Sequence, residues 1–110
     1  MTKRWRIHAE TLAEIDATAA WYDAQRAGLD LEFLAELRAT LGALRAAPGV
    51  STPDREAPGD AHVRRRRLHR FPYAVVFAES ATEYVVIAVM HLRRRPGYWL
   101  SRLDEQPSKG

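Results

Sequence analysis

Cysteine is absent from the 110 residues of the chain, and this absence excludes several kinds of chemistry. Disulfide bridges, thiolate nucleophiles and metal centres held by cysteine cannot form. The sequence also has no apolar run near the roughly 18 residues that a membrane-spanning helix requires. Residues 1–6 include the basic side chains Lys3, Arg4 and Arg6 and are followed by no apolar stretch, so we expect no secretory signal. These features predict a cytoplasmic protein that does not enter a membrane.

The composition is typical of one folded domain. Hydrophobic residues make up 46% of the chain, which is enough for a core, while 28% are charged, which disfavours a membrane protein. A length of 110 residues is close to the usual size of a single domain. We expect one domain over residues 1–103 and a flexible tail over residues 104–110.

Charge is distributed unevenly along the chain. Residues 9–36 contain seven acidic side chains and only Arg26 as a base, whereas residues 61–102 contain nine arginines against two glutamates. The protein should therefore have an acidic and a basic surface, and the basic one is suited to attract a polyanion.

Two consecutive helices are predicted in the N-terminal half. Thr11 and Glu14 have the spacing of a capping box, which predicts a helix start there. Gly28 is expected to end this helix, and Asp30 is expected to cap a second helix over residues 31–47. Because only a few residues join the helices, they should pack as an antiparallel hairpin with acidic faces toward solvent.

Strands are predicted on both sides of this hairpin. The last two are apolar on both faces, which places them inside a sheet. The predicted strands cover residues 4–8, 63–70, 73–79 and 84–91, and an irregular connection covers residues 48–61. The order β-α-α-β-β-β predicts an α+β fold in which the helical hairpin packs on one face of a mainly antiparallel sheet.

Short motifs rich in aromatic residues and arginine follow one another between residues 5 and 102. They are Trp21-Tyr22, Gly28-Leu29, Phe33-Leu34, Val63-Arg64-Arg65, Arg70-Phe71-Pro72-Tyr73, residues 85–89, His91-Leu92-Arg93-Arg94-Arg95-Pro96 and Tyr98-Trp99-Leu100-Ser101-Arg102. In order and spacing these motifs resemble the toxins of the RelE/ParE superfamily, which belong to bacterial type II toxin–antitoxin pairs and include plasmid-stabilisation proteins. The resemblance implies a growth inhibitor neutralised by an antitoxin. It also implies two alternative modes of action: cleavage of ribosome-bound mRNA as an mRNA interferase, or inhibition of DNA gyrase without chemistry.

Cleavage of RNA requires a proton acceptor, a proton donor and guanidinium groups that stabilise the phosphorane. His91 and Tyr98 are the candidate acid–base residues, and Arg65 and Arg70 are the candidate ligands of the scissile phosphate. Both acid–base candidates have a plainer interpretation. His91 would then end a core-facing row of its strand, and Tyr98 would pack at the sheet edge.

The arginine runs are candidates for anion binding. Four consecutive arginines in a strand cannot all face one side, and Arg65 and Arg67 are expected on the face that the helices leave open. With Arg93 and Arg94 they form the predicted set of RNA- or phosphate-binding residues, because guanidinium groups match phosphate oxygens well. The alternative is a solvated sheet edge whose charge prevents aggregation.

Antitoxin binding is expected, by the resemblance, at the helical hairpin and the sheet edge. Trp21, Tyr22 and Phe33 are the candidate contacts. Large aromatic residues at helical spacing are also typical of a core, and this second interpretation stays open.

No metal site and no cofactor are predicted. The four histidines do not pair on one predicted face, and no acidic cluster accompanies them. The sequence therefore predicts a toxin whose partners are a cognate antitoxin and either the ribosome with mRNA or DNA gyrase. A degenerate member that only binds antitoxin is a third alternative. A homodimer or a hetero-oligomer with the antitoxin is compatible with all three.

Overall fold

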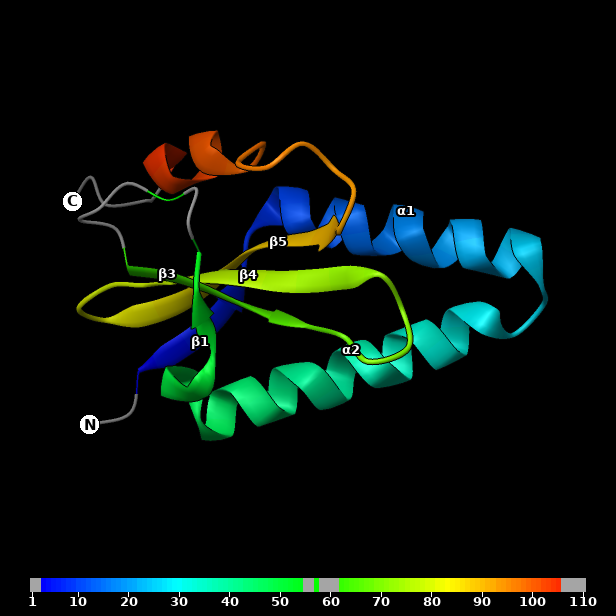
Figure 1. The fold of residues 1–110 in the computed structure, drawn as a ribbon, viewed down its shortest axis with the longest axis horizontal. Helices are drawn as coiled ribbons and strands as arrows, with labels where there is room; N and C mark the ends of the chain where they lie inside the picture. The colour runs from blue at the N-terminus through cyan, green and yellow to red at the C-terminus, as the bar shows by residue number, and fades with distance from the viewer. Residues whose placement is uncertain (1–2, 55–56, 58–61, 106–110) are drawn as a thin grey trace.

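The fold is α+β, as the order of predicted elements indicates. The computed structural model describes residues 3–54, 57 and 62–105. The elements are β1 (Arg4–Ile7), α1 (Ala9–Gln25), α2 (Leu29–Ala46), the short 3-10 helix η1 (Pro48–Val50), β2 (Thr52–Pro53), β3 (His62–Arg67), β4 (Tyr73–Glu79), β5 (Glu83–His91) and the 3-10 helix η2 (Leu100–Glu105). The two α-helices form a hairpin whose tip extends beyond the sheet (Figure 1), in a molecule of 43 × 28 × 26 Å.

The sheet has the strand order β1-β5-β4-β3-β2. Strand β1 runs parallel to β5, and the other neighbours are antiparallel, so the prediction of a mainly antiparallel sheet is confirmed. The two-residue strand β2 lies inside the stretch that the sequence predicts to be irregular, and it pairs with β3 at one edge of the sheet. Residues 55–56 and 58–61 of that stretch lie outside the described residues.

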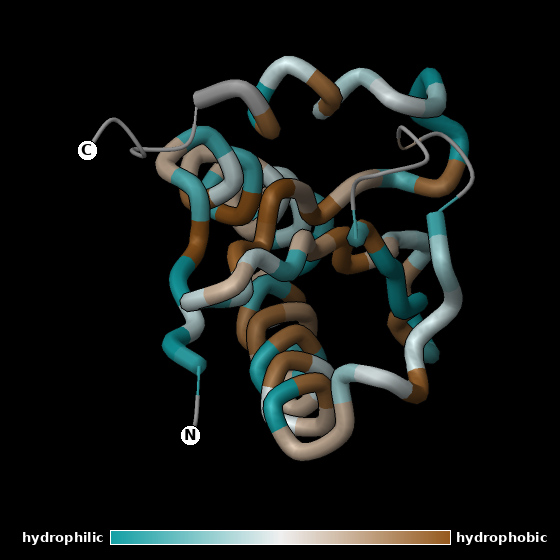
Figure 2. Tube along the Cα trace, turned by 90° about the vertical axis from the view of Figure 1, so that its left-hand side faces the viewer, coloured by the Kyte–Doolittle hydropathy of each residue, from teal (hydrophilic) through white to brown (hydrophobic). Residues whose placement is uncertain are grey.

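The helical hairpin covers one face of the sheet and builds a core against it. We call this the helix side. Its buried residues are Tyr22, Phe33, Leu37, Leu44, Leu68, Phe71, Val75, Phe77, Val86 and Val89. Figure 2 shows the hydrophobic segments gathered in the interior and hydrophilic segments toward the periphery.

The opposite face, which we call the far face, is not open, and this corrects the expectation from the sequence. A second core there contains Val63, Ala74, Val76, Val85, Ile87, Ala88, Met90 and Trp99. Trp99 is fully buried, because the C-terminal segment folds back over the sheet. A register shift between Val76 and Phe77 lets both Ile87 and Ala88 turn toward this core, as a β-bulge does.

The helix boundaries differ from the predicted ones. Helix α1 begins at Ala9, and its N-cap is His8, whose Nδ1 accepts a hydrogen bond from the Glu10 amide at 3.0 Å. The predicted capping box of Thr11 and Glu14 is therefore wrong. Thr11 is buried within the first turn, and the Glu14 carboxylate accepts hydrogen bonds from Tyr98 and Arg102.

The start of α2 also differs from the prediction. Gly28, at φ 90°, occupies the N-cap position, so the predicted cap Asp30 lies inside the first turn. A left-handed backbone conformation is accessible to glycine at little cost, which explains why glycine stands between the two helices.

The C-terminal helix η2 continues to Glu105, which lies within the range 104–110 that the sequence predicts to be a tail. Residues 106–110 lie outside the described part of the chain. Among the described residues, no helix is both long and apolar enough to cross a membrane.

Candidate functional site

Arginines of β3 and of the turn after β5 gather on the far face. In the β3–β4 register Arg65 lies opposite Val76 and Arg67 opposite Ala74. Both partners belong to the far-face core, so the two arginines project to the side that strand alternation predicts. The neighbouring Arg64 turns the other way and donates to the Ser51 carbonyl at 2.9 Å.

Two cavities that share Arg65 mark this surface, which we call the basic groove. One of about 310 Å³ is lined by residues 50–52 and 65–67. The other, of about 160 Å³, is lined by Asp54, Arg65, Met90, Leu92, Arg94, Pro96, Gly97 and Trp99. The ion pairs within the described part of the chain involve none of Arg65, Arg67 and Arg94. The groove therefore offers guanidinium groups to an external anion, with Asp54 as one acidic residue in its wall.

A third cavity, of about 370 Å³, lies on the helix side and is lined by Trp21, Tyr22, Pro72, Tyr73 and His91. We call it the aromatic pocket. The His91 ring packs edge-on against Tyr73, with ring centres 5.1 Å apart. Its Nδ1 accepts a hydrogen bond from the Arg93 amide at 3.0 Å, which places the proton of the neutral imidazole on Nε2. His91 is thus held as a wall of the pocket.

Of the three predicted antitoxin contacts, only Trp21 offers substantial surface. Its side chain is 57% exposed at the mouth of the aromatic pocket. Phe33 is fully buried among Tyr22, Phe71 and Tyr73, which favours the core interpretation of this residue. Tyr22 is also buried, and burial together with the nearby Tyr73 raises the pKa of its hydroxyl.

Glu14, Tyr98 and Arg102 form a hydrogen-bonded group that we call the C-terminal clamp. The Tyr98 hydroxyl donates to Glu14 Oε2 at 2.7 Å, and Arg102 Nη2 donates to the same oxygen at 2.8 Å. Burial and this bond to a carboxylate raise the pKa of Tyr98 far above its usual value. The clamp attaches the C-terminal segment to α1. Within it, the Tyr98 hydroxyl has Glu14 as its hydrogen-bond partner.

The clamp also closes an edge of the sheet. Strand β1 pairs with β5 only as far as Val86. Farther along, Glu14 Oε1 accepts from the Val89 amide at 3.1 Å, and Arg102 Nη1 donates to the Ile87 carbonyl at 2.8 Å. Buried backbone groups need such partners, and here side chains replace the missing strand.

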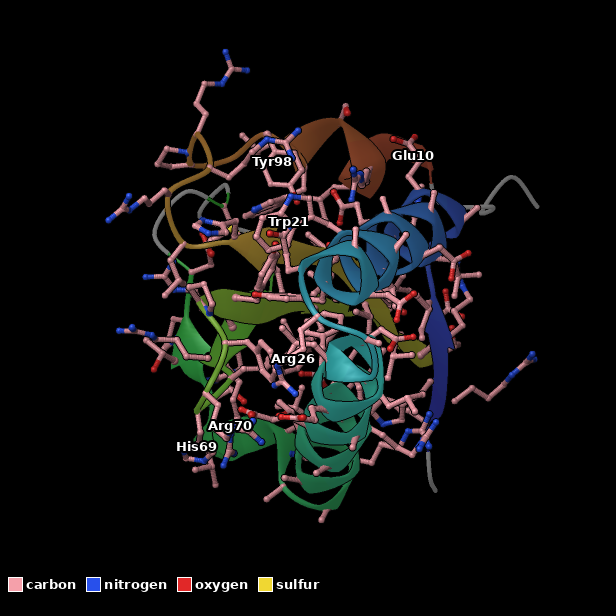
Figure 3. All side chains as sticks on the ribbon, turned by 90° about the vertical axis from the view of Figure 1, so that its right-hand side faces the viewer. Glu10, Trp21, Arg26, His69, Arg70 and Tyr98 are labelled. Carbon is pink, nitrogen blue, oxygen red and sulfur yellow. The ribbon has the colours of Figure 1, made fainter. Side chains whose placement is uncertain are left out.

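Arg70 lies in a third place, beside α2. Its Nη2 donates to Glu32 Oε1 at 2.6 Å, and its backbone amide donates to the Glu36 carboxylate, as the His69 amide also does. Glu32 also binds Arg26, and the hydrogen bonds from Arg70 and Arg26 lower the pKa of Glu32. Figure 3 shows Arg26, His69 and Arg70 near α2 and apart from Tyr98.

The four predicted catalytic residues therefore occupy different surroundings. His91 lies in the aromatic pocket on the helix side, and Arg65 lies in the basic groove on the far face. Tyr98 belongs to the C-terminal clamp, and Arg70 is paired with Glu32. The predicted phosphate ligands are closer to expectation, because Arg65, Arg67 and Arg94 all line the groove, whereas Arg93 is exposed outside its lining.

Sequence reasoning missed the roles of Glu14 and of the pocket residues Pro72 and Tyr73. Glu14 was part of an acidic helix face expected to meet solvent, and only the return of the C-terminal segment turns it inward. The described residues contain no group of three or more acidic or histidine side chains able to hold a metal ion.

Comparison with known proteins places this geometry in a known fold. No protein-family model and no curated protein sequence matches the chain. Among solved structures, a chain of the "Chromosomal ParDE TA system from P. aeruginosa" superposes with a TM-score of 0.70. The two chains share one fold. Their sequences are 17% identical, and the match covers 82% of this chain and 96% of the other. The fold that the RelE/ParE resemblance implies is thus confirmed.

Proposed function

We propose that the protein is the toxin of a type II toxin–antitoxin pair and that a cognate antitoxin neutralises it. The observation that carries this proposal is the shared fold with a chain of a ParDE TA system over nearly the whole of that chain. The ordered motifs of the sequence, which resemble RelE/ParE toxins, support it independently of the structure. Because one fold can host several activities, the mode of action is argued from the surfaces.

The surfaces favour a ParE-like toxin that inhibits DNA gyrase by binding, without chemistry of its own. General acid–base catalysis requires the proton-transferring groups and the phosphate ligands to reach one reacting centre. Here His91 and Arg65 stand on opposite faces of the sheet, and the Tyr98 hydroxyl and the Arg70 guanidinium are bonded to glutamates. This separation supports inhibition by contact over RNA cleavage.

Ribosome-dependent mRNA cleavage is the second candidate, and one observation favours it. The basic groove presents Arg65, Arg67 and Arg94 without a carboxylate partner in the described part of the chain. Guanidinium groups in such a groove are well matched to a phosphodiester backbone.

Two reactions run on one folded preparation distinguish these modes. In the first, purified gyrase supercoils relaxed plasmid DNA in the presence of increasing amounts of the protein. In the second, a defined mRNA is translated in a cell-free system and its 5′ ends are mapped by primer extension, with and without ribosomes. We expect supercoiling to be inhibited and the mRNA to stay intact.

Ribosome-dependent cuts that disappear in His91→Ala and Arg65→Ala would contradict the binding mode and establish the enzyme. If neither reaction responds and cells expressing the protein grow normally, the remaining alternative is a degenerate member that only binds antitoxin.

A further inference from the structure

The basic groove holds positive charge that the fold itself does not neutralise. Arg65 is half-buried and lines both cavities, while Arg67 and Arg94 are exposed. Among the described residues, none of the three guanidinium groups has a carboxylate in an ion pair. Like charges gathered in this way repel one another, and an anion that binds among them relieves the repulsion and stabilises the folded state.

The two cavities give this charge the shape of a site. Their volumes are about 310 and 160 Å³, and each is several times the roughly 30 Å³ that one water molecule occupies. Arg65 is common to both, Arg67 lines the larger cavity and Arg94 lines the smaller one. An anion that reaches into both cavities therefore has all three guanidinium groups around it.

The Arg94 side chain is held in place at the groove. Its guanidinium lies over the Tyr98 ring at 4.0 Å from the ring centre, and the Tyr98 hydroxyl is bonded to Glu14. A guanidinium group that is positioned before binding loses less conformational entropy when a ligand arrives. The stacking therefore favours a defined anion site over a diffuse basic surface.

The groove suits phosphoryl groups better than it suits the bases of a nucleic acid. Single-stranded nucleic acids are bound largely by stacking their bases on aromatic side chains. The aromatic residue in the lining is Trp99, which is fully buried, and the nearby Tyr98 ring already has the guanidinium groups of Arg94 and Arg102 against it. Asp54 in the wall of the smaller cavity also repels a long anionic backbone that continues past it.

We propose that the basic groove binds a compact anion of linked phosphoryl groups, a short polyphosphate chain, with Arg65 as its central ligand and Arg67 and Arg94 as further ligands. Guanidinium groups form paired hydrogen bonds with phosphoryl oxygens, and a short chain concentrates its charge within the groove. Because recognition is confined to the phosphoryl groups, an inorganic chain and a nucleoside triphosphate with the same chain bind alike. The site is independent of the proposed toxin activity, since it requires neither an antitoxin nor a cellular target.

Isothermal titration calorimetry of the purified full-length chain tests this proposal. The ligands are sodium tripolyphosphate, orthophosphate, citrate and ATP, each at low salt and without divalent cations. We expect tripolyphosphate to bind one-to-one and at least tenfold more tightly than orthophosphate or citrate, because it supplies several phosphoryl groups at once. ATP should bind within about threefold of tripolyphosphate, and the affinity of both should fall as salt rises.

Protein variants locate the site. Arg65→Gln should weaken tripolyphosphate binding at least tenfold, because it removes a charge-assisted contact, and Arg67→Gln and Arg94→Gln should each weaken it severalfold. Arg38→Gln is the matched control. Arg38 is exposed and likewise outside the ion pairs of the described residues, but it lies on α2, which covers the helix side. This variant should bind as the parent does, and circular dichroism will verify that every variant is folded.

Four results would overturn the proposal. They are no binding of tripolyphosphate at low salt, equal losses in Arg65→Gln and Arg38→Gln, citrate binding as tightly as tripolyphosphate, and ATP binding tenfold more tightly than the inorganic chain, which would show that the base is recognised. A uridine tetranucleotide that binds more tightly than tripolyphosphate, and loses its affinity in Arg65→Gln, would assign the groove to nucleic acid instead.

Growth of cells expressing the parent protein tests the proposed function separately. Growth inhibition by a chain that does not bind tripolyphosphate would remove the anion site alone. Binding by a chain that does not inhibit growth would leave the site standing and remove the toxin.

Discussion

At the scale of single residues, Glu14 determines how the C-terminal segment is held. Its carboxylate accepts hydrogen bonds from Tyr98, Arg102 and the Val89 amide, and Arg102 keeps only 9% of its side-chain surface exposed. Removing the charge leaves the buried Arg102 guanidinium with only the longer ion pair to the exposed Glu10, at 3.5 Å, which is unfavourable. We expect Glu14→Gln to lower the free energy of unfolding by about 2 to 3 kcal/mol.

Urea denaturation followed by circular dichroism measures this change. Asp16→Asn removes the same charge from an exposed position on α1 and should shift the free energy by less than about 0.5 kcal/mol. Equal free energies of unfolding for the two variants would show that the clamp does not stabilise the fold.

Tyr98 makes the stability of the protein sensitive to alkaline pH. Its pKa is raised above the usual 10.0 by burial and by its hydrogen bond to Glu14, so the folded state holds the phenolic proton more tightly than the unfolded state. This contribution is complete below about pH 10 and is lost as pH rises further, because only the unfolded state then ionises. We expect the parent to lose more stability between pH 9 and 11 than Tyr98→Phe does, as urea midpoints measured at each pH will report. Parallel curves for the two proteins would contradict this assignment.

At the scale of elements, the two helices depend on one glycine. Gly28 has φ 90°, and no neighbouring atom lies within 4 Å of the position that a Cβ would occupy. The cost of a side chain there is backbone strain alone, so Gly28→Ala should destabilise the protein by about 1 kcal/mol.

Gly42 is the matched comparison. It lies within α2, has equally open surroundings and does not have a positive φ. Gly42→Ala should therefore stabilise by about 0.5 to 1 kcal/mol, because alanine is the better helix former. Thermal unfolding measures the Tm of both variants. A Tm that moves in the same direction in both would contradict the claim that Gly28 is needed for its left-handed backbone conformation.

Local patterns predicted the elements well because their causes are local. The two runs that are apolar on both faces give β4 and β5 nearly at their observed bounds, and strand alternation places Arg65 and Arg67 on the far face. The errors arise where distant segments meet. The C-terminal segment covers the far face with Trp99 and draws Glu14 into the clamp, and no periodicity within α1 or β5 contains that information.

The arrangement of the candidate site also depends on contacts between distant segments, which local sequence patterns do not predict. The sequence supplied residues suited to RNA chemistry, but their mutual positions depend on which side of the sheet each strand end faces. His91 faces the helices and Arg65 faces away from them, and this separation is visible only once the register and the bulge between Val76 and Phe77 are known. Trp21 lines a cavity whose other walls, Pro72 and Tyr73, come from a loop and a strand far along the chain, and no pattern within α1 predicts them.

At the scale of the whole molecule, the uneven charge of the sequence is partly neutralised on folding. Glu32 binds Arg70, and Glu10 and Glu14 bind Arg102, so two of the arginines in the basic half are paired with the acidic hairpin. The arginines of the basic groove and of the turn beside the aromatic pocket remain for partners. These arginines extend from the basic groove on the far face to the turn after β5, and Arg94 belongs to both.

Growth of a bacterial culture under inducible expression tests the central claim most directly. The account predicts that induction of the parent chain lowers colony counts by several orders of magnitude, while an empty vector has no effect. Soluble, folded protein must be verified in the same culture by its elution as a compact species. Normal colony counts at a verified level of folded protein would contradict the claim that this chain is a toxin.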